Sequence, residues 1–237
     1  MSEAVLTANG LTKQYHGAPA LEGLNLELPK GRIIGLLGPN GSGKTTFIKI
    51  AAGLLTPNAG KIAIDGKAVG PDTKALVSYL PDRPYFGKSM KVGQQLDFFQ
   101  DFYADFDRKR AEEMLKALNI SPEAKFKSLS KGNQEKVQLV LVMSRRAKLY
   151  LLDEPIGGVD PAARDYILNT IITNYDPEAS VLISTHLIAD VERILDEFIF
   201  LHNGKIVHRG SADEEREETG KSLDKLFREV FQCLPNC

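Results

Sequence analysis

The stretch Gly38-Pro39-Asn40-Gly41-Ser42-Gly43-Lys44-Thr45-Thr46 decides how this chain of 237 residues folds. It fits the pattern G-x-x-x-x-G-K-[ST], whose glycines let successive backbone N–H groups converge on phosphate oxygens. The positive end of a following helix favours the same negative charge. We expect Lys44 to reach the β- and γ-phosphates of a nucleotide and the Thr45 hydroxyl to bind Mg²⁺.

The residues on either side of this loop predict a strand, a loop and a helix in succession. Ile33–Leu37 is a short apolar run typical of a buried strand. Beyond the loop, apolar residues recur at helical spacing: Phe47, Ile48, Ile50, Ala51, Leu54 and Leu55. A glycine-rich turn that matched the pattern by chance would lack both neighbours, so the sequence predicts a nucleotide site.

The composition fits one sizeable α/β domain, or one domain with a lobe of its own, and only one phosphate loop is present. Lys and Arg number 30 against 31 Asp and Glu, so no strong field would hold nucleic acid or an anionic membrane surface. The start lacks a basic region followed by an apolar one, and no apolar run approaches the roughly 18 residues of a membrane span. We therefore expect a cytoplasmic protein.

The two cysteines, Cys233 and Cys237, stand four positions apart at the end of the chain with no histidine close by in sequence. This spacing suits neither a common zinc site nor a disulfide framework. We interpret them as ordinary thiols in a reducing compartment.

Strand and hairpin patterns occur near both ends of the chain. Residues 5 to 28 are typical of antiparallel strands, because Leu24–Leu28 alternates between apolar and polar side chains. Asp65-Gly66 and Asn203-Gly204 each predict a tight hairpin turn. Tyr15 precedes a glycine turn, where its ring either stacks on a nucleotide base or simply packs against its neighbours.

The middle of the chain changes to a helical pattern. After the predicted strand Val77–Leu80, two prolines in Pro81-Asp82-Arg83-Pro84 stop regular structure. From about Val92 to Met143 the pattern indicates an inserted helical lobe. Its aromatic residues either form the core of the lobe or partly line a groove for a partner: Phe99, Phe102, Tyr103 and Phe106. Ser121-Pro122 predicts the start of a further short helix.

A second helix start follows at Leu129-Ser130-Lys131-Gly132-Asn133. The free N–H groups and the dipole of a helix favour an anion at its start. By itself this stretch is only a capped helix.

Two carboxylates come directly after a buried strand, Leu149–Asp153. A continuous apolar run is typical of a parallel strand, and ligands gather at the carboxyl ends of such strands. Asp153 is of the kind that binds Mg²⁺, and Glu154 is a candidate base for a hydrolytic water. His186 ends another buried run and is a candidate γ-phosphate contact.

Near the C-terminus, Leu223, Leu226, Phe227 and Val230 stand at helical spacing after a run rich in glutamate. They predict an amphipathic helix that packs on the core or faces a partner.

In their order and intervals these motifs resemble the ATP-binding subunit of ABC transporters over nearly the whole chain. The resemblance implies an α/β P-loop NTPase with a mostly parallel central sheet, an N-terminal antiparallel β subdomain and an inserted helical signature subdomain. The ATPase domain would span residues 1–210, with the lobe at about 90–145, and a C-terminal amphipathic tail would span 211–237.

The same resemblance assigns roles by position. Tyr15 matches the adenine-stacking aromatic, Gly38 to Thr46 the Walker A loop, and Asp153 with Glu154 the Walker B pair. Ser130 and Gly132 match the signature motif, Asp160 the D-loop acid, and His186 the switch histidine. Lys44, Glu154 and His186 would then take part in catalysis.

The family architecture implies a sandwich dimer, in which two ATPs lie between the phosphate loop of one subunit and the signature helix of the other. Ser130 would then act on the partner's ATP. The chain would pair with itself or with a sister ATPase and drive integral membrane permease subunits from the cytoplasmic face of the membrane.

Two departures from the family pattern stand out. Asp82 occupies the position where glutamine is usual, a position that contacts the metal and couples to the membrane part. The signature has Ser-Lys-Gly-Asn where Ser-Gly-Gly-Gln is usual, so Lys131 adds a positive charge. This sequence looks most like bacterial exporter ATPases with separate membrane subunits.

Two other interpretations use the same phosphate loop. A soluble ABC ATPase could act on ribosomes or DNA, but such relatives usually carry two nucleotide domains, coiled coils or zinc motifs. A small-molecule kinase would have no use for the signature helix or His186.

Overall fold

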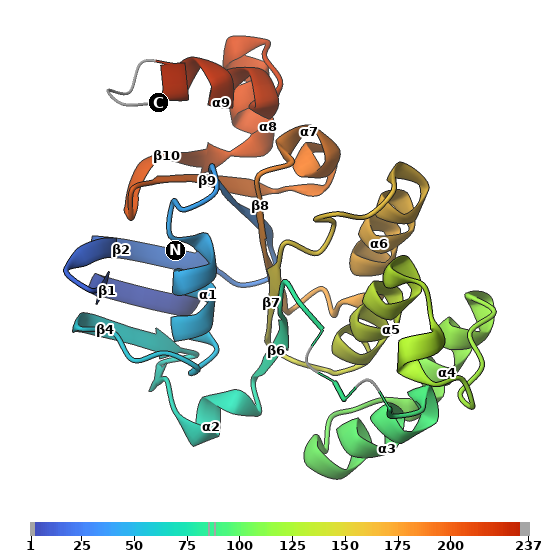
Figure 1. Ribbon diagram of the computed structural model, residues 1–237. Coiled ribbons are helices and arrows are strands. Elements are labelled where there is room, and N and C mark those ends of the chain that lie inside the picture. The colour runs from blue at the N-terminus through green and yellow to red at the C-terminus, as the bar shows by residue number, and fades with distance from the viewer. Residues whose placement is uncertain (1–2, 85, 88, 233–237) are drawn as a thin grey trace.

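The protein consists of two β-sheets and a layer of helices (Figure 1). The computed structural model describes residues 3–84, 86–87 and 89–232. Cys233 and Cys237, interpreted above as ordinary thiols, lie outside the described residues. Over the described part of the chain, no helix has the length and apolar character needed to span a membrane.

The smaller sheet is antiparallel and carries the N-terminus. Its strand order is β2-β1-β4-β5, formed by β1 (Ala4–Tyr15), β2 (Ala18–Pro29), β4 (Ala59–Ile64) and β5 (Lys67–Ala68). The predicted Asp65-Gly66 turn joins β4 to β5, and both of its residues have positive φ, as a tight hairpin requires. The antiparallel strands predicted from residues 5 to 28 are therefore confirmed.

The larger sheet has six strands in the order β10-β9-β3-β8-β7-β6. All neighbouring pairs are parallel except β9 and β10, which form the hairpin predicted at Asn203-Gly204. The strands are β3 (Ile33–Leu37), β6 (Val77–Leu80), β7 (Leu149–Asp153), β8 (Ser180–Thr185), β9 (Glu197–His202) and β10 (Lys205–Ser211). Every residue of β3, β7 and β8 is buried, which explains their continuous apolar sequences.

Helix α1 (Lys44–Ala51) lies between the two sheets (Figure 1). Phe47 and Ile48 are fully buried in the core that both sheets share. The helix ends earlier than its apolar spacing predicts, because Gly53 takes a positive φ and turns the chain away. Leu54, expected on the buried face, is 55% exposed.

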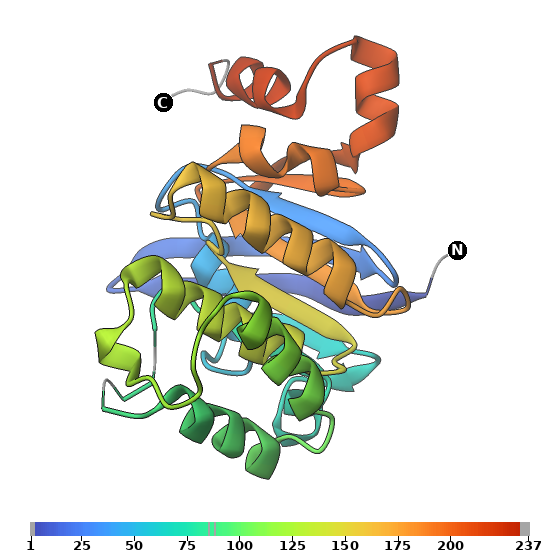
Figure 2. The same ribbon diagram turned by 90° about the vertical axis from the view of Figure 1, so that its right-hand side faces the viewer.

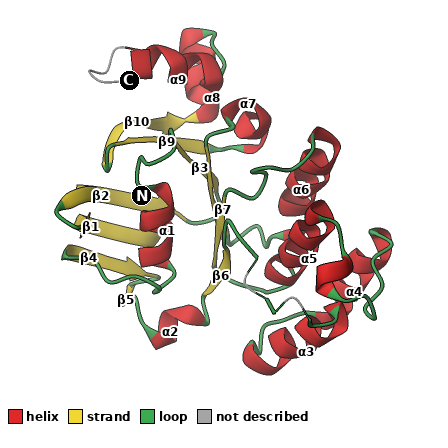
Figure 3. Cartoon of the chain, in the orientation of Figure 1, coloured by secondary structure: helices red, strands yellow, loops and turns green. Residues whose placement is uncertain are grey.

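Helices cover the other face of the parallel sheet, as the red and yellow elements of Figure 3 show. The inserted lobe contains α3 (Val92–Phe102), α4 (Arg108–Ala117), the 3-10 helix η1 (Phe126–Ser128) and α5 (Lys131–Met143). Helix α5 runs beside α6 (Pro161–Asn174) in Figure 2. Phe99 is buried in the lobe core, whereas Phe102 is 69% exposed.

The helix predicted at Ser121-Pro122 does not form, and this prediction was wrong. The segment makes a turn, and its carbonyls serve the start of α3 instead. Pro122 O accepts from Gly93 N at 2.8 Å and Ala124 O accepts from Val92 N at 3.0 Å. Hydrogen bonding to the free N–H groups of α3 thus outweighs the local tendency of Ser121-Pro122 to start a helix.

The remaining helices are short or lie near the C-terminus: α2 (Pro71–Lys74), α7 (Ile188–Val191), the 3-10 helix η2 (Glu192–Ile194), α8 (Ala212–Thr219) and α9 (Leu223–Gln232). Leu223, Leu226 and Phe231 of α9 are buried in the main core. The predicted amphipathic helix therefore packs on its own protein.

Candidate functional site

The phosphate loop connects the end of β3 to the start of α1, and two strands press closely against it. A Cβ atom on Gly38 would lie 2.3 Å from Leu201 O of β9, and one on Gly43 would lie 2.4 Å from Ala20 O of β2. Gly43 also has a φ of 109°. The backbone can take this path only with glycine at both positions.

The Lys44 side chain is 5% exposed and folds back over its own loop. Its amino group donates to Gly38 O at 2.8 Å and to Pro39 O at 3.1 Å, and lies 3.7 Å from Glu154 Oε1. Burial lowers the pKa of Lys44, while the charges of Glu154 and Asp153 oppose that shift. The lysine is thus held at the place where the loop would meet phosphate oxygens.

Asp153 is held by hydroxyl groups on two neighbouring elements. Its Oδ1 accepts from Thr45 Oγ1 of α1 at 3.0 Å and from Ser184 Oγ of β8 at 2.6 Å. Its Oδ2 is buried, and no described residue donates to it. Burial raises the pKa of Asp153, and the hydroxyl bonds from Ser184 and Thr45 counteract that shift. A buried carboxylate oxygen without a partner next to a threonine hydroxyl fits a hard cation such as Mg²⁺.

Within the described ranges, no three histidine, cysteine or acidic side chains gather closely enough to hold a metal on their own. Mg²⁺ does not need such a cage, since it binds through one or two carboxylates together with substrate phosphates and water. The set of Thr45 and Asp153 therefore matches a metal that arrives with a nucleotide.

Glu154 follows directly and adopts a φ of 49°, a left-handed conformation that is uncommon for a residue with a side chain. Thr185 Oγ1 donates to its Oε2 at 3.0 Å, and His186 Nδ1 lies 3.1 Å from its Oε1. His186 itself is 41% exposed. Since such strain persists only where the surroundings impose it, β7 and β8 together fix this carboxylate facing the loop.

The predicted residues Lys44, Thr45, Asp153, Glu154 and His186 are thus brought together at one edge of the sheet. The sequence motifs do not include Ser184 and Thr185, whose hydroxyls orient the two carboxylates. Their signal was available, because both precede His186 at the carboxyl end of a buried parallel strand. It was weak, because hydroxyl residues are common in strands.

Tyr15 ends β1, opposite Ala18 of β2, on the hairpin whose Ala20 O abuts the phosphate loop. Its ring is 43% exposed, and Lys13 Nζ lies 5.5 Å from the ring centroid. The exposed face is available to a flat base.

The signature residues lie apart from the Lys44 cluster, on the helical side of the parallel sheet (Figure 1). Ser130 caps α5 by accepting from Asn133 N at 3.3 Å, and a side chain at Gly132 would meet open space. Asp160 caps α6, where it accepts from Ala163 N at 3.1 Å. Lys131 reaches from α5 to Gly158, five residues after the end of β7, and lies 3.7 Å from Glu135.

Asp82 lies in the loop after β6, with its side chain 41% exposed and Arg83 Nε at 3.8 Å. Its negative charge contributes to the raised pKa of Asp153, so the two carboxylates face a common region. It also shares the lining of a small gap with Glu154 and Gly157.

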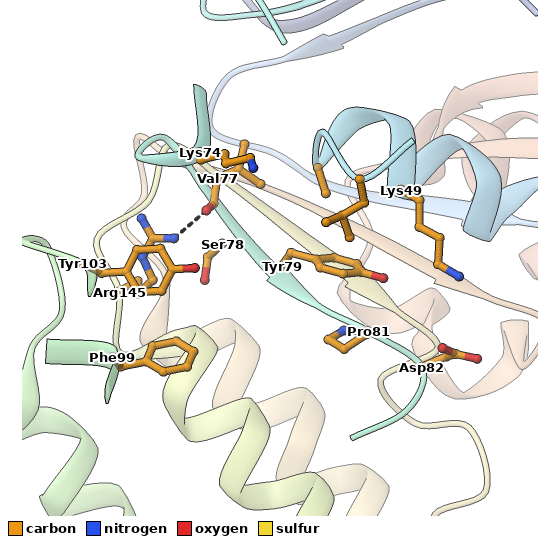
Figure 4. A pocket seen from close by; sticks show the side chains of 12 residues that line it. Lys49, Lys74, Val77, Ser78, Tyr79, Pro81, Asp82, Phe99, Tyr103 and Arg145 are labelled. Atoms are coloured by element: carbon orange, nitrogen blue, oxygen red, sulfur yellow. Dashed lines mark hydrogen bonds between the residues drawn. The ribbon is translucent and has the colours of Figure 1, made fainter. Parts of the chain in front are cut away.

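A cavity of about 510 Å³ opens beside Asp82, between the core and the helical lobe (Figure 4). Leu54, Phe99 and Tyr103 give it an apolar lining, and Lys49 and Lys74 add two cationic side chains. Arg145 closes one end by donating to Val77 O at 2.6 Å, and its guanidinium lies over the Tyr103 ring at 3.8 Å. We call this cavity the lobe groove.

Comparisons with known proteins agree with this geometry. A sequence profile of the family described as "ABC transporter" matches residues 21–157. The chain is 33% identical to the ABC-type transporter ATP-binding protein EcsA of Bacillus subtilis over 96% of each chain. It is 30% identical to the SkfA peptide export ATP-binding protein SkfE of the same organism, over 95% of this chain and 98% of that one.

A solved structure described as the ATP-binding subunit of an ABC transporter superimposes with a TM-score of 0.86. It is 30% identical in sequence and covers 96% of this chain and 99% of its own. Its fold therefore matches this one along almost the full length.

Proposed function

The chain belongs to the ABC transporter family as an ATP-hydrolysing, ATP-binding subunit, and from this membership we propose that it drives export through separate membrane subunits. The observation that carries the proposal is the cluster of Lys44, Thr45, Asp153, Glu154 and His186 around one phosphate loop. Residues 1–210 would form the ATPase domain and residues 211–237 its tail.

Each residue of the cluster has a role that its surroundings support. The loop amides and Lys44 bind the β- and γ-phosphates, while Tyr15 stacks on adenine. Thr45 and Asp153 would hold Mg²⁺, with Asp82 as a candidate for a further contact, and the metal would neutralise charge on the phosphates. Glu154 accepts the proton of the attacking water, and His186 keeps that carboxylate and the γ-phosphate in register.

The signature residues of this chain lie apart from its own Lys44 cluster, which supports a dimer. Ser130 and Gly132 stand at the start of α5, across the sheet from the loop that holds Lys44. The free N–H groups there favour an anion. ABC ATPase subunits dimerise, and we propose that Ser130, Gly132 and Asp160 complete the site of a second subunit, either a copy of this chain or a sister ATPase.

The partner on the membrane side is proposed from the lobe groove. Its lining is largely apolar, with Lys49, Lys74 and Arg145 as cationic side chains against the single carboxylate of Asp82. These features complement a short cytoplasmic segment of a permease subunit that carries apolar residues and an acidic one. The subunit would thus sit on the cytoplasmic face of the membrane.

Export as the direction is supported by the name of SkfE, a peptide export ATP-binding protein. The relatives favour this role over the alternative of an ATPase acting on ribosomes or DNA. Cargo selection would rest with the membrane subunits.

Light scattering of Glu154→Gln after chromatography, with ATP and Mg²⁺ present, tests the proposal. Blocking hydrolysis should trap a closed dimer. The control Glu178→Gln, at an exposed turn, should have the same size in solution as the wild type. A second change, Lys44→Ala, should abolish the trapped dimer because ATP no longer binds.

A Glu154→Gln protein that binds ATP and stays monomeric would point to a sister ATPase as the dimer partner. Failure of the wild type to bind ATP would overturn the proposed function.

A further inference from the structure

Tyr79 forms the wall between the lobe groove and the magnesium end of the nucleotide site. In Figure 4 its ring lies along the groove, and its hydroxyl points toward the side on which Lys49 and Asp82 lie. Lys49 follows Thr45 by four residues in α1, so both side chains project from one face of that helix. Tyr79 therefore touches the groove with its ring and approaches the metal residues with its hydroxyl.

The register of the sheet explains this placement. Tyr79 of β6 pairs with Leu151 of β7, and Asp153 stands two residues further along the same strand. Because side chains alternate between faces, Tyr79, Leu151 and Asp153 all point to the α1 face. A tyrosine is long enough to span such a diagonal to the neighbouring strand.

Two buried polar atoms near this diagonal have no partner in the described part of the chain. One is the Tyr79 hydroxyl, and the other is Asp153 Oδ2. The first can donate a hydrogen bond and the second can only accept one, so their needs are complementary. Burial raises the pKa of Tyr79 above its ordinary value, and the charges of Asp153 and Asp82 raise it further. The hydroxyl thus stays protonated, and the charges of both carboxylates act on it.

Buried polar groups in native proteins rarely lack a partner, and an ordered water commonly supplies one. A water here would have the polar partners that such a site needs: Tyr79, Asp153 and the nearby Asp82. A carboxylate oxygen has two lone pairs, so Asp153 Oδ2 can accept from the water and still face a cation.

We propose that Tyr79 is a positioning residue, whose hydroxyl holds Asp153 through one bridging water and so sets the orientation of the carboxylate toward Mg²⁺. The hydroxyl does not touch nucleotide or metal. Since the same ring lines the lobe groove, a segment bound there would press on the group that orients Asp153. This inference rests on the proposed nucleotide function and adds a path from the groove to the metal.

The test compares Tyr79→Phe with Tyr150→Phe, since each change removes one buried phenolic hydroxyl. Tyr150 lies on the opposite face of the sheet, where its hydroxyl donates to Arg145 O at 2.6 Å. The measured quantity is the affinity for a non-hydrolysable ATP analogue with and without Mn²⁺, by calorimetry on the intact chain. The ratio of the two affinities reports the metal contribution alone.

In Tyr79→Phe we expect this ratio to fall about five-fold, the size of one water-mediated hydrogen bond, with the metal-free affinity and the melting temperature nearly unchanged. Tyr150→Phe should show the reverse pattern, with a lower melting temperature and the wild-type ratio. The electron paramagnetic resonance spectrum of bound Mn²⁺ should change in Tyr79→Phe only.

An unchanged ratio and spectrum in Tyr79→Phe would overturn the positioning role. Absence of nucleotide binding by the wild type would instead refute the proposed function, so the two failures are distinguishable.

Discussion

Thr45 Oγ1 donates a hydrogen bond to Asp153 Oδ1 at 3.0 Å, which ties the first turn of α1 to the end of β7. These residues stand 108 positions apart in the chain. The bond is made within the protein itself, so the fold brings these two metal-binding candidates together. Pre-organisation of this kind reduces the conformational cost of binding.

Replacing Asp153 by Asn should stabilise the empty protein while removing the effect of Mg²⁺. Burial raises the pKa of this carboxyl, which means that the folded state holds the charge at a cost. We expect Asp153→Asn to melt about 2–4 °C higher without ligand, the shift that about 1 kcal/mol produces in a chain of this size. Scanning calorimetry with and without Mg²⁺ and ATP checks both parts.

The raised pKa of Asp153 also predicts that the stability of the folded protein depends on pH. Its pKa is higher in the folded than in the unfolded chain, so the folded protein binds more protons in the window between the two values. The contribution of Asp153 to stability is therefore largest below the unfolded pKa and is lost as the pH rises through the folded one. The stability difference between Asp153→Asn and wild type should be smallest below pH 3.8, the ordinary value, and should grow as the pH rises from there toward neutral. A constant difference across this range would contradict it.

Lys44→Ala should lower ATP affinity at least 100-fold, because it removes the charge that the loop holds at the phosphate position. Lys49→Ala, on the same helix, is the matched control, since Lys49 faces the lobe groove. Equilibrium binding of a labelled ATP measures both. Equal losses in the two variants would mean that general positive charge, rather than the position of Lys44, determines affinity.

Thr185→Val should lower kcat about ten-fold and change the KM for ATP little. The substitution keeps the shape of the side chain but removes the hydrogen bond to Glu154 Oε2. A bond to a charged group contributes about 1.5–3 kcal/mol, and its loss frees the carboxylate to turn away from the attacking water. Steady-state phosphate release gives both constants, and Thr173→Val, at an exposed position on α6, serves as the control.

Tyr15→Ala should weaken ATP binding more than binding of inorganic phosphate, because the ring would stack on the base and not on phosphate. Tyr15→Phe keeps the ring and should behave like the wild type. An ATP affinity that is unchanged in Tyr15→Ala would remove this residue from the site.

Asp82→Ala tests whether the loop after β6 couples ATP hydrolysis to the membrane part. In a complex reconstituted with its permease subunits, we expect transport to fall more than ATP hydrolysis, because Asp82 borders the lobe groove. Equal losses of the two rates would assign Asp82 to the chemistry alone.

The sequence predicts this fold well where local and tertiary preferences agree. The apolar run Leu149–Asp153 is buried along its whole length, and the Asn203-Gly204 turn forms with the required positive φ values. The prediction fails at Ser121-Pro122. No helix starts there, and carbonyl groups of this segment accept hydrogen bonds from the first N–H groups of α3 instead. A capping signal contributes only about 1 kcal/mol, so a neighbouring helix with free N–H groups can override it.

In the candidate site, too, the residues that belong to local motifs could be predicted, and those that depend on the arrangement of strands were harder to predict. Lys44, Asp153 and Glu154 could be predicted because their motifs are fixed in spacing along the chain. The signal of Ser184 is weak and Tyr79 has none, because the importance of both depends on which strands are neighbours. The order β8-β7-β6 brings the Ser184 hydroxyl against Asp153 from one neighbouring strand and places Tyr79 on the other, and no linear pattern encodes that order.

The backbone oxygens of Gly38 and Pro39, which accept hydrogen bonds from the Lys44 amino group, also bear on product release. They act as an internal competitor for every anion that enters. A triphosphate offers many oxygens and displaces them, whereas a single phosphate ion gains little from doing so. We expect the loop to hold inorganic phosphate far more weakly than ATP, so that free phosphate inhibits turnover little.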